Sequence, residues 1–272
     1  MLVNFMLIGA QKCGTTTLHG ILESHPSLSP CTIKEPQFFC TTKDWRKEVD
    51  AYHEKFDQSA DSIFFESSTT YTFLPTRNIG VWEDIYAYNP DMKFIYVVRK
   101  PIDAVISRYM HYYERGLIDC TFEEAIINDR VFIDFSRYFT QISPYIERFG
   151  RDNVLVLDFH DLNNERTATL KEVASFLDID FSGFKEYESM HRNISVGGRK
   201  PNMKFDNLNF SQKLLKKFFP AYWDRVTRNS ERGFKEKPKP STKAITLINT
   251  MMRPEIDGLE SIINKDLTGW RT

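Results

Sequence analysis

The chain has 272 residues and a formal net charge of −1 at pH 7. Hydrophobic residues make up 41% of it and charged residues 27%, which is enough apolar material for one sizeable core and excludes wholesale disorder. The balanced charge argues against bulk nucleic-acid affinity, so we expect no nucleic-acid partner, although a local basic site is compatible with it. The length suits one α/β unit, and we predict a single domain over residues 1–272.

Membrane and targeting signals are missing from the sequence. No run approaches the roughly 18 apolar residues that a membrane-spanning helix needs. Residues 1–9 lack the basic region and the small-residue cleavage site of a signal peptide. The four cysteines, Cys13, Cys31, Cys40 and Cys120, form no Cys-x-x-Cys pair, which favours a reducing compartment. We therefore expect no transmembrane segment, a cytoplasmic location and, because no metal-ligand cluster stands out, no metal.

Strand-like and helical patterns alternate along the chain. Short apolar runs, each typical of a buried strand, occupy residues 5–8, 62–65, 93–98 and 153–157. Apolar residues at helical spacing follow within residues 18–22, 102–113 and 170–177. Near-continuous apolar strands that alternate with helices imply a parallel sheet covered on both faces, so we predict an α/β fold.

The last quarter of the chain has a different composition. Residues 199–239 hold twelve Lys or Arg against four acids. This stretch is either a solvated surface with an irregular loop or an anion-binding flap. Beyond it, apolar residues at helical spacing over 254–263 predict a C-terminal helix that ends near Trp270.

A glycine-containing loop lies between the first predicted strand and the first predicted helix. It reads Gly9-Ala-Gln-Lys-Cys-Gly-Thr-Thr-Thr17. At this place free backbone N–H groups and the helix dipole favour an anion. The frame is close to that of the nucleotide-binding P-loop, but the P-loop lysine would stand at Thr15, three positions after Lys12. The pattern predicts phosphate binding with a different charge distribution, such as one 5′-phosphate that carries a transferable group.

A second basic motif follows the 93–98 run. Arg99 ends that strand, and Ser107 stands eight residues on, two turns into the next predicted helix. A guanidinium can form a charge-assisted fork to a phosphate, and a hydroxyl can donate to the same group. Together with the first loop, this motif indicates a site for a nucleotide that is phosphorylated at two places.

These residues carry a family resemblance. Residues 12–18 resemble the 5′-phosphosulfate loop of sulfotransferases that use 3′-phosphoadenosine 5′-phosphosulfate (PAPS), and residues 99–107 resemble their 3′-phosphate motif. Residues 34–39 (Lys-Glu-Pro-Gln-Phe-Phe) and the C-terminal helix are similar to the carbohydrate, or heparan-type, branch, and to bacterial members without a membrane anchor. The resemblance implies a P-loop-like three-layer fold, in which helices flank a central parallel sheet. It also implies transfer of a sulfuryl group from PAPS to an acceptor hydroxyl, with PAP as the product nucleotide.

The resemblance implies roles for residues around the two phosphates. Lys12 would stabilise the charge on the leaving phosphate. The 5′-phosphate would rest on backbone and hydroxyl groups of the loop, namely those of Cys13, Gly14, Thr15, Thr16 and Thr17. Arg99 and Ser107 would hold the 3′-phosphate and so favour PAPS over ordinary adenosine nucleotides.

For the base that takes the acceptor proton, the resemblance points to Glu66. This residue follows the 62–65 run and precedes a Ser/Thr-rich loop, and the carboxyl ends of strands face the ligand crevice of an α/β sheet. Many cytosolic relatives use a histidine instead, so His53 and His111 are alternatives, although neither lies in the family's histidine-bearing segment. Lys34, in the Lys-Glu-Pro motif, would assist transfer or orient the acceptor.

Two further places resemble nucleotide contacts of the family. Tyr138 corresponds to a position near the nucleotide. Gly198, Arg199 and Lys200 combine glycine with basic residues, which suits a backbone and a guanidinium that close on a phosphate. The K-G-R-x-H-P pattern and flanking disulfide of secretory-pathway members are missing, and so is the dimerisation pattern of cytosolic members, so the oligomeric state stays open.

Two other functions stay open on the sequence alone. The loop and the acid that ends Val154–Asp158 would also suit an ATP- or GTP-dependent phosphotransferase, but Arg99 and Ser107 are then unexplained. A non-catalytic nucleotide- or glycan-binding protein on the same fold is the third interpretation. If the chain is a sulfotransferase, the glutamate base and the 34–39 segment favour an acceptor hydroxyl on a carbohydrate or glycosylated molecule.

Overall fold

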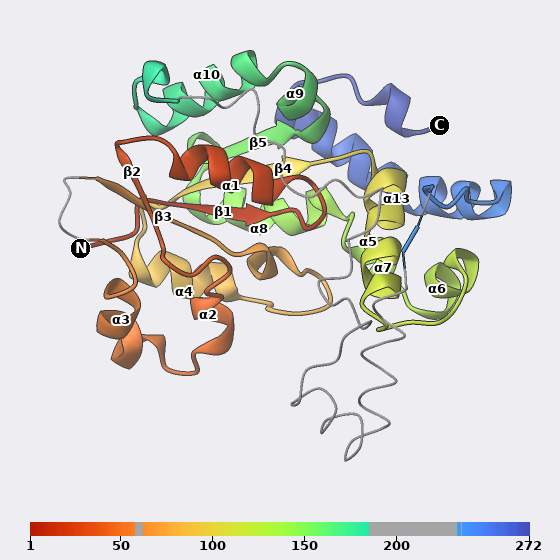
Figure 1. Ribbon diagram of the computed structural model, residues 1–272, viewed down its shortest axis with the longest axis horizontal. Helices are drawn as coiled ribbons and strands as arrows, with labels where there is room; N and C mark the ends of the chain where they lie inside the picture. Colours follow the sequence, from red (N-terminus) through yellow and green to blue (C-terminus); the bar gives the residue numbers. More distant parts are fainter. Residues whose placement is uncertain (58–61, 185–232, 235) are drawn as a thin grey trace, which may run out of the picture.

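The computed structural model describes residues 1–57, 62–184, 233–234 and 236–272, and its centre is a five-stranded sheet (Figure 1). The strand order is β2-β3-β1-β4-β5, and every pairing is parallel. The strands are β1 (Phe5–Gly9), β2 (Leu28–Pro30), β3 (Ile63–Ser67), β4 (Lys93–Val98) and β5 (Val154–Asp158). All four predicted strands are therefore confirmed within two residues, and so is the α/β class.

Helices cover both faces of the sheet (Figure 1). On one side lie α1 (Thr15–Glu23), α9 (Phe159–Asn164) and α10 (Arg166–Leu177). On the other side lie α2 (Phe38–Thr41), α3 (Trp45–His53), α4 (Val81–Tyr88) and α8 (Tyr138–Phe149). The remaining described helices are α5 (Pro101–Glu114), α6 (Phe122–Asn128), α7 (Val131–Asp134) and α13 (Thr242–Ile263). This is the predicted three-layer arrangement.

The side chains of the strands alternate between the two helical layers. Phe94 of β4 packs edge-on against Tyr145 of α8, with ring centroids 5.0 Å apart. On the opposite face, Phe5 of β1 stacks on Phe65 of β3 at 4.9 Å, beneath His19 of α1. Both faces of the central strands are buried, which explains why their sequences are apolar without a break.

Two predictions about elements were incomplete. β2 was not predicted because it is a three-residue edge strand that ends in Pro30, too short to form a pattern. The C-terminal helix begins at Thr242, well before the predicted start at residue 254, and Pro254 lies inside it. Ser241 caps this helix by accepting from the amide of Ala244. Most of the basic 199–239 stretch lies outside the described residues.

Because the strands are parallel, their carboxyl ends meet at one edge of the sheet. The loop over residues 10–14 follows β1, and a 3₁₀ turn, η1 (Thr69–Thr72), follows β3. Arg99 follows β4 and Phe159 follows β5. The fold thus gathers the predicted functional segments at this edge. None of the described helices combines the length and apolar character that crossing a bilayer requires.

Candidate active site

The loop after β1 has the geometry of an anion-binding turn. Gly14 caps α1 in the left-handed region with φ of 86°, and Lys12 shares that region with φ of 69°. Within the described part of the chain, the amides of Gly14, Thr15 and Thr16 have no hydrogen-bond acceptor. These N–H groups lie at the positive end of the α1 dipole, so the loop can accept an anion without breaking any bond of its own.

Phe159 joins this loop to the second predicted motif. A Cβ at Gly14 would lie 2.6 Å from Cδ2 of Phe159, so only glycine fits there. The Arg99 guanidinium stacks on the same ring, with Cζ 4.6 Å from the centroid. Arg99 Nη1 also donates to the carbonyl oxygen of Lys12 at 3.3 Å. The structure therefore brings Lys12 and Arg99 together, as the two motifs predicted.

Lys12 is partly buried among other cations. Burial, assisted by the charges of Arg108, Arg115 and Arg99 and opposed by that of Glu114, lowers the pKa of its ammonium to about 8. A phosphate or sulfuryl group beside it would favour the charged form again, since an opposite charge has that effect. Neighbouring guanidinium groups thus repel the charged form of this lysine, and a bound anion would offset that repulsion.

Cys13 and Tyr138 form a buried support behind the loop. The Sγ of Cys13 lies 3.4 Å from the Oη of Tyr138. Burial raises the pKa of the Cys13 thiol to about 12, so it stays protonated. Tyr138 is almost fully buried and packs against Tyr96 of β4. Both residues lie next to the predicted phosphate site, and their contact with a nucleotide stays a prediction.

The other predicted nucleotide residues differ in exposure. Thr15 and Thr17 are buried, whereas Thr16 is partly exposed. Ser107 lies two turns into α5 and is nearly buried. Residues 198–200, predicted as a late phosphate-binding loop, lie outside the described residues.

Glu66, the predicted base, lies on β3 with none of its surface exposed. Tyr52 Oη donates to its Oε2 at 2.7 Å, while its Oε1 is buried without a partner. Burial raises the pKa of this carboxyl to about 7, although the hydroxyls of Tyr52, Tyr71 and Ser68 act to lower it. A carboxyl enclosed in this way has no surface with which to contact an acceptor, so its position argues for a supporting role.

Glu35 is the more accessible carboxylate at the same end of the sheet. Its amide donates to the carbonyl of Ser67 at 2.9 Å, and its Oε2 accepts from the amide of Thr69 at 2.8 Å. Lys34 Nζ lies 3.2 Å from its Oε1, and the two side chains are 29% and 28% exposed. In the Lys-Glu-Pro motif, Lys34 was the predicted functional residue, and its neighbour Glu35 was not predicted.

η1 connects this carboxylate to the phosphate loop. Thr69, which holds Glu35, begins η1, and Thr72, which ends it, donates its hydroxyl to the carbonyl of Ile8 at 2.9 Å. A Cβ at Gly9 would lie 2.6 Å from that same hydroxyl oxygen. The start of the loop and the η1 turn are therefore in direct contact, and the site has a cationic side and a carboxylate side.

The first alternative base, His53, belongs to another part of the molecule. His53 Nε2 contacts Tyr88 Oη at 2.9 Å, and that oxygen also accepts from the amide of Val3. Val3 precedes β1, so this histidine lies at the amino edge of the sheet, away from the loop. The structure therefore contradicts a role for His53 as base. His111 lies in the last turn of α5, and its role as an alternative base stays a prediction.

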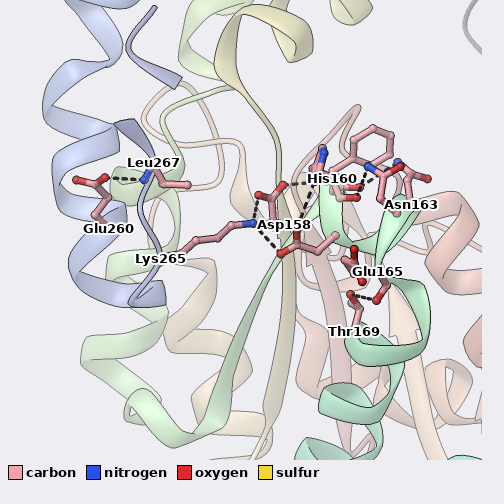
Figure 2. Close-up of polar contacts among 11 residues, drawn as sticks. Asp158, His160, Asn163, Glu165, Thr169, Glu260, Lys265 and Leu267 are labelled. Atoms are coloured by element: carbon pink, nitrogen blue, oxygen red, sulfur yellow. Dashed lines mark hydrogen bonds and ion pairs between the residues drawn. The ribbon is translucent and has the colours of Figure 1, made fainter. Parts of the chain in front are cut away.

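Asp158, the acid that a phosphotransferase would use for a metal, has other partners (Figure 2). Its Oδ1 accepts from the amide of His160 at 2.8 Å, and its Oδ2 accepts from Lys265 Nζ at 2.5 Å. Lys265 also pairs with Asp161 at 2.7 Å. Asp158 thus caps α9 and anchors the segment after α13. In the described ranges, no group of three or more His, Cys, Asp or Glu residues is arranged to hold a metal ion.

Comparison with known proteins gives a family match over almost the whole chain. The sulfotransferase domain family model matches residues 3–271. Human bifunctional heparan sulfate N-deacetylase/N-sulfotransferase 2 is 26% identical over 204 residues, which cover 65% of this chain and 22% of that protein. Human carbohydrate sulfotransferase 15 is 21% identical over 300 residues, which cover 84% of this chain and 53% of that protein. The chain thus spans between about a fifth and about a half of the length of these relatives.

Solved structures show the same fold. A sulfotransferase from Alicyclobacillus acidocaldarius superposes with a TM-score of 0.71 and 20% identity, over 100% of both chains. The sulfotransferase domain from the curacin biosynthetic pathway superposes with a TM-score of 0.52 and 14% identity, over 93% of this chain and 98% of that one. The fold is therefore the one that the two phosphate motifs implied.

Proposed function

The chain belongs to the sulfotransferase family, whose members move a sulfuryl group from PAPS to an acceptor, and we propose that its own acceptor is a hydroxyl of a carbohydrate. In this reaction the acceptor oxygen gains a bond to sulfur and loses its proton to a base. The bond between sulfur and the bridging oxygen of the nucleotide breaks, and PAP leaves with the electron pair. The site must therefore bind two phosphates, stabilise a leaving oxygen and accept a proton.

One observation carries the nucleotide part of this proposal: the unpaired amides of the β1–α1 loop, Lys12 and Arg99 all lie at one edge of the sheet. Gly14 leaves room for Phe159, which positions the Arg99 guanidinium beside the loop. The donor set suits two anionic groups better than one, since backbone amides and a guanidinium each prefer a phosphate. Ser107, on the helix that follows Arg99, is the proposed hydroxyl partner of the 3′-phosphate.

Lys12 is the proposed stabiliser of the leaving group. Its ammonium stands in the loop that would hold the 5′-phosphosulfate, and positive charge at a developing oxyanion is among the largest catalytic effects. The hydroxyls of Thr15, Thr16 and Thr17 and the backbone of Cys13 and Gly14 complete the proposed phosphate site. Tyr138 and residues 198–200 stay predicted nucleotide contacts.

Glu35 is the carboxylate that the geometry favours as the general base. It is partly exposed, and the amide of Thr69 fixes it to the turn that contacts the phosphate loop. Lys34, 3.2 Å away, would orient the acceptor or assist transfer. Glu66, which the sequence favoured as base, is enclosed by Tyr52 and Tyr71 and would act by holding this part of the site in place.

The acceptor class rests on the relatives. Their names include heparan sulfate and carbohydrate sulfotransferases, which supports a sugar acceptor for this chain. One of them is an N-sulfotransferase, so an amine is the competing acceptor atom. We also propose that residues 1–272 form a single domain. A cytoplasmic location is proposed too, and it rests on the cysteine usage alone.

Turnover of PAPS with a panel of sugars tests this function. We expect PAP to be released together with an acceptor that is heavier by one sulfuryl group, as measured by mass spectrometry. Treatment of the product with dilute acid distinguishes an O-sulfate from the more labile N-sulfate. The proposal is rejected in favour of a phosphotransferase if the protein transfers phosphate from ATP with magnesium and releases no PAP from PAPS with any sugar of the panel.

A further inference from the structure

Lys265 stands in the C-terminal segment that follows α13, and the proposed mechanism does not use it. Its Nζ lies 2.5 Å from Oδ2 of Asp158 and 2.7 Å from Oδ2 of Asp161, so one cation joins two carboxylates (Figure 2). The side chain of Asp158 is only 5% exposed, and that of Lys265 is 35% exposed. Partial burial works against the charged form of the lysine, but hydrogen bonds to the two carboxylates outweigh it and raise the pKa of the ammonium. Lys265 therefore stays charged and compensates a buried carboxylate.

The backbone around Lys265 is held in place by α13. The helix ends at Asn264, which adopts the left-handed conformation with φ of 49° and so turns the chain back. The amide of Leu267 donates to Oε1 of Glu260 at 2.7 Å, and the Leu267 side chain is 1% exposed. Arg271 forms an ion pair with the same glutamate. Lys265 thus reaches β5 from a fixed support, unlike the two mobile side chains of an ordinary surface ion pair.

Asp158 connects this lysine to the guanidinium of Arg99. Its two oxygens have separate partners, since Oδ1 accepts from the amide of His160 and Oδ2 accepts from Lys265. Phe159 follows Asp158 directly along the chain, so the position of its backbone is set by these two bonds. The Phe159 ring carries the Arg99 guanidinium on its face, with Cζ 4.6 Å from the centroid. A chain of contacts thus runs from Lys265 through Asp158 and Phe159 to Arg99.

The same C-terminal segment contacts the proposed nucleotide site at two further places. Lys100, which directly follows Arg99, donates from Nζ to the carbonyl of Gly269 at 2.8 Å. Trp270 packs edge-on against Tyr138, the residue behind the phosphate loop, with ring centroids 6.4 Å apart. The segment therefore meets the end of β5, the start of α5 and the first turn of α8, all of which border the proposed site.

We propose that Lys265 is a positioning residue for the 3′-phosphate: by holding Asp158 and Phe159 it fixes the orientation in which Arg99 meets the nucleotide. This inference rests on the proposed function. A guanidinium binds a phosphate best when its planar fork is aligned with the oxygens, and the Phe159 ring sets that alignment. Without Lys265, Oδ2 of Asp158 would be left buried without its partner, which is unfavourable unless the residue moves. Arg99 would then lose its alignment although its own sequence is unchanged.

A double-mutant cycle of PAP binding tests this role. Calorimetric titration gives the Kd of PAP for wild type, Lys265→Met, Arg99→Ala and the double variant. We expect Lys265→Met to weaken PAP binding by roughly three- to tenfold, a part of the effect of losing the charged contact of Arg99. In the Arg99→Ala background the same substitution should have no further effect, because the residue that it positions is already gone. Equal losses in the two backgrounds would overturn the proposal.

Asp158→Asn separates positioning from the mere loss of a positive charge. If Lys265 acted on PAP only through its charge, removing this cation and removing the anion at Asp158 would change the affinity in opposite directions. Positioning predicts that both substitutions weaken PAP binding, because asparagine has one oxygen and cannot serve both His160 and Lys265. Tighter PAP binding by Asp158→Asn would overturn the proposal. Lys171→Met, which removes an exposed lysine of α10, is the matched control and should leave PAP binding unchanged.

Thermal unfolding without nucleotide shows at which temperature every variant is folded, and the titrations are made there. A lower Tm of Lys265→Met together with wild-type affinity for PAP would assign the lysine a purely structural role and overturn the proposal. If Lys265→Met does not fold, Asp158→Asn takes its place in the cycle with Arg99→Ala, and the same outcomes decide. Failure of wild type to bind PAP rejects the proposed function, whereas wild-type binding that Lys265→Met leaves unchanged rejects only the role of Lys265.

Discussion

The two sides of the proposed active site are built in different ways. On the proposed phosphate side, backbone geometry makes the site: a left-handed Gly14, unpaired amides at the start of α1, and Arg99 stacked on Phe159. On the carboxylate side, side chains make it: Glu35 is held by Thr69 and Lys34, and Glu66 is enclosed by tyrosines.

The difference follows from what each side has to do. Phosphate is the same in every reaction of such an enzyme, so a fixed set of donors on a rigid turn suits it. Accepting a proton requires a carboxylate whose pKa and position are set by its neighbours. A hydrogen bond from Thr72 to Ile8 joins the two sides, so the proposed phosphate loop and the turn that holds the proposed base are fixed relative to each other.

The largest expected effect is on the carboxylate side, where two glutamates compete for the role of base. Glu35→Gln should lower kcat by about 10²–10⁴-fold, because a positioned general base contributes that much. Glu66→Gln should lower kcat far less, since the glutamine fills the same buried space and can still accept from Tyr52. Steady-state rates of both variants with saturating PAPS decide between them. A severe loss of kcat in Glu66→Gln with a mild one in Glu35→Gln would reverse the assignment.

On the phosphate side, Lys12→Met should lower kcat by about 10²–10³-fold, as removal of one group that stabilises a developing charge does. PAP binding should weaken much less, because the loop amides and Arg99 remain. Lys47→Met, on the exposed face of α3, is the control for loss of one positive charge. Equal losses in kcat and in PAP affinity would mean that Lys12 only binds the nucleotide.

The burial of Glu66 predicts a pH dependence of stability. Its pKa in the folded chain, about 7, lies above the ordinary 4.5, so folding favours the protonated form. The stability that this contributes is present below about pH 4.5 and is lost as the pH rises to about 7. Relative to wild type, Glu66→Gln should therefore gain up to about 3 kcal/mol in the free energy of unfolding across this window. Denaturant titrations at several pH values measure it, and a pH-independent difference would contradict the burial.

A smaller effect concerns the charge of Lys12. Its pKa of about 8 in the free protein means that PAP binding must take up a proton above pH 8. Between pH 7 and pH 9 the affinity for PAP should fall by up to about tenfold, a window that lies above the second ionisation of the phosphates, near pH 6. Calorimetry in buffers of different ionisation enthalpy detects the proton directly. In Lys12→Met the affinity for PAP should not change between pH 7 and pH 9. A pH-independent affinity in wild type would show that Lys12 does not take up a proton when PAP binds.

The sequence predicted one of these two sides more completely than the other. The loop after β1 and Arg99 are short motifs next to apolar strands, and parallel strands bring their ends together, so the sequence was sufficient to place them at one edge of the sheet; their binding of phosphate stays a prediction. The base was predicted at Glu66 because a strand end faces the crevice. Whether its carboxyl is exposed depends on Tyr52, Tyr71 and other residues distant in sequence, which no local pattern reveals. Glu35 was passed over although it stands in the Lys-Glu-Pro motif, because its exposure and its hydrogen bond with Thr69 are set by packing.

Calorimetric titration with PAP, next to ATP with magnesium, tests the central claim of a two-phosphate site most directly. We expect PAP to bind wild type, Arg99→Ala to weaken that binding by about tenfold to a hundredfold through loss of a charged contact, and ATP with magnesium to bind more weakly than PAP. Tight binding of ATP with magnesium and no heat from PAP would show that there is no two-phosphate site.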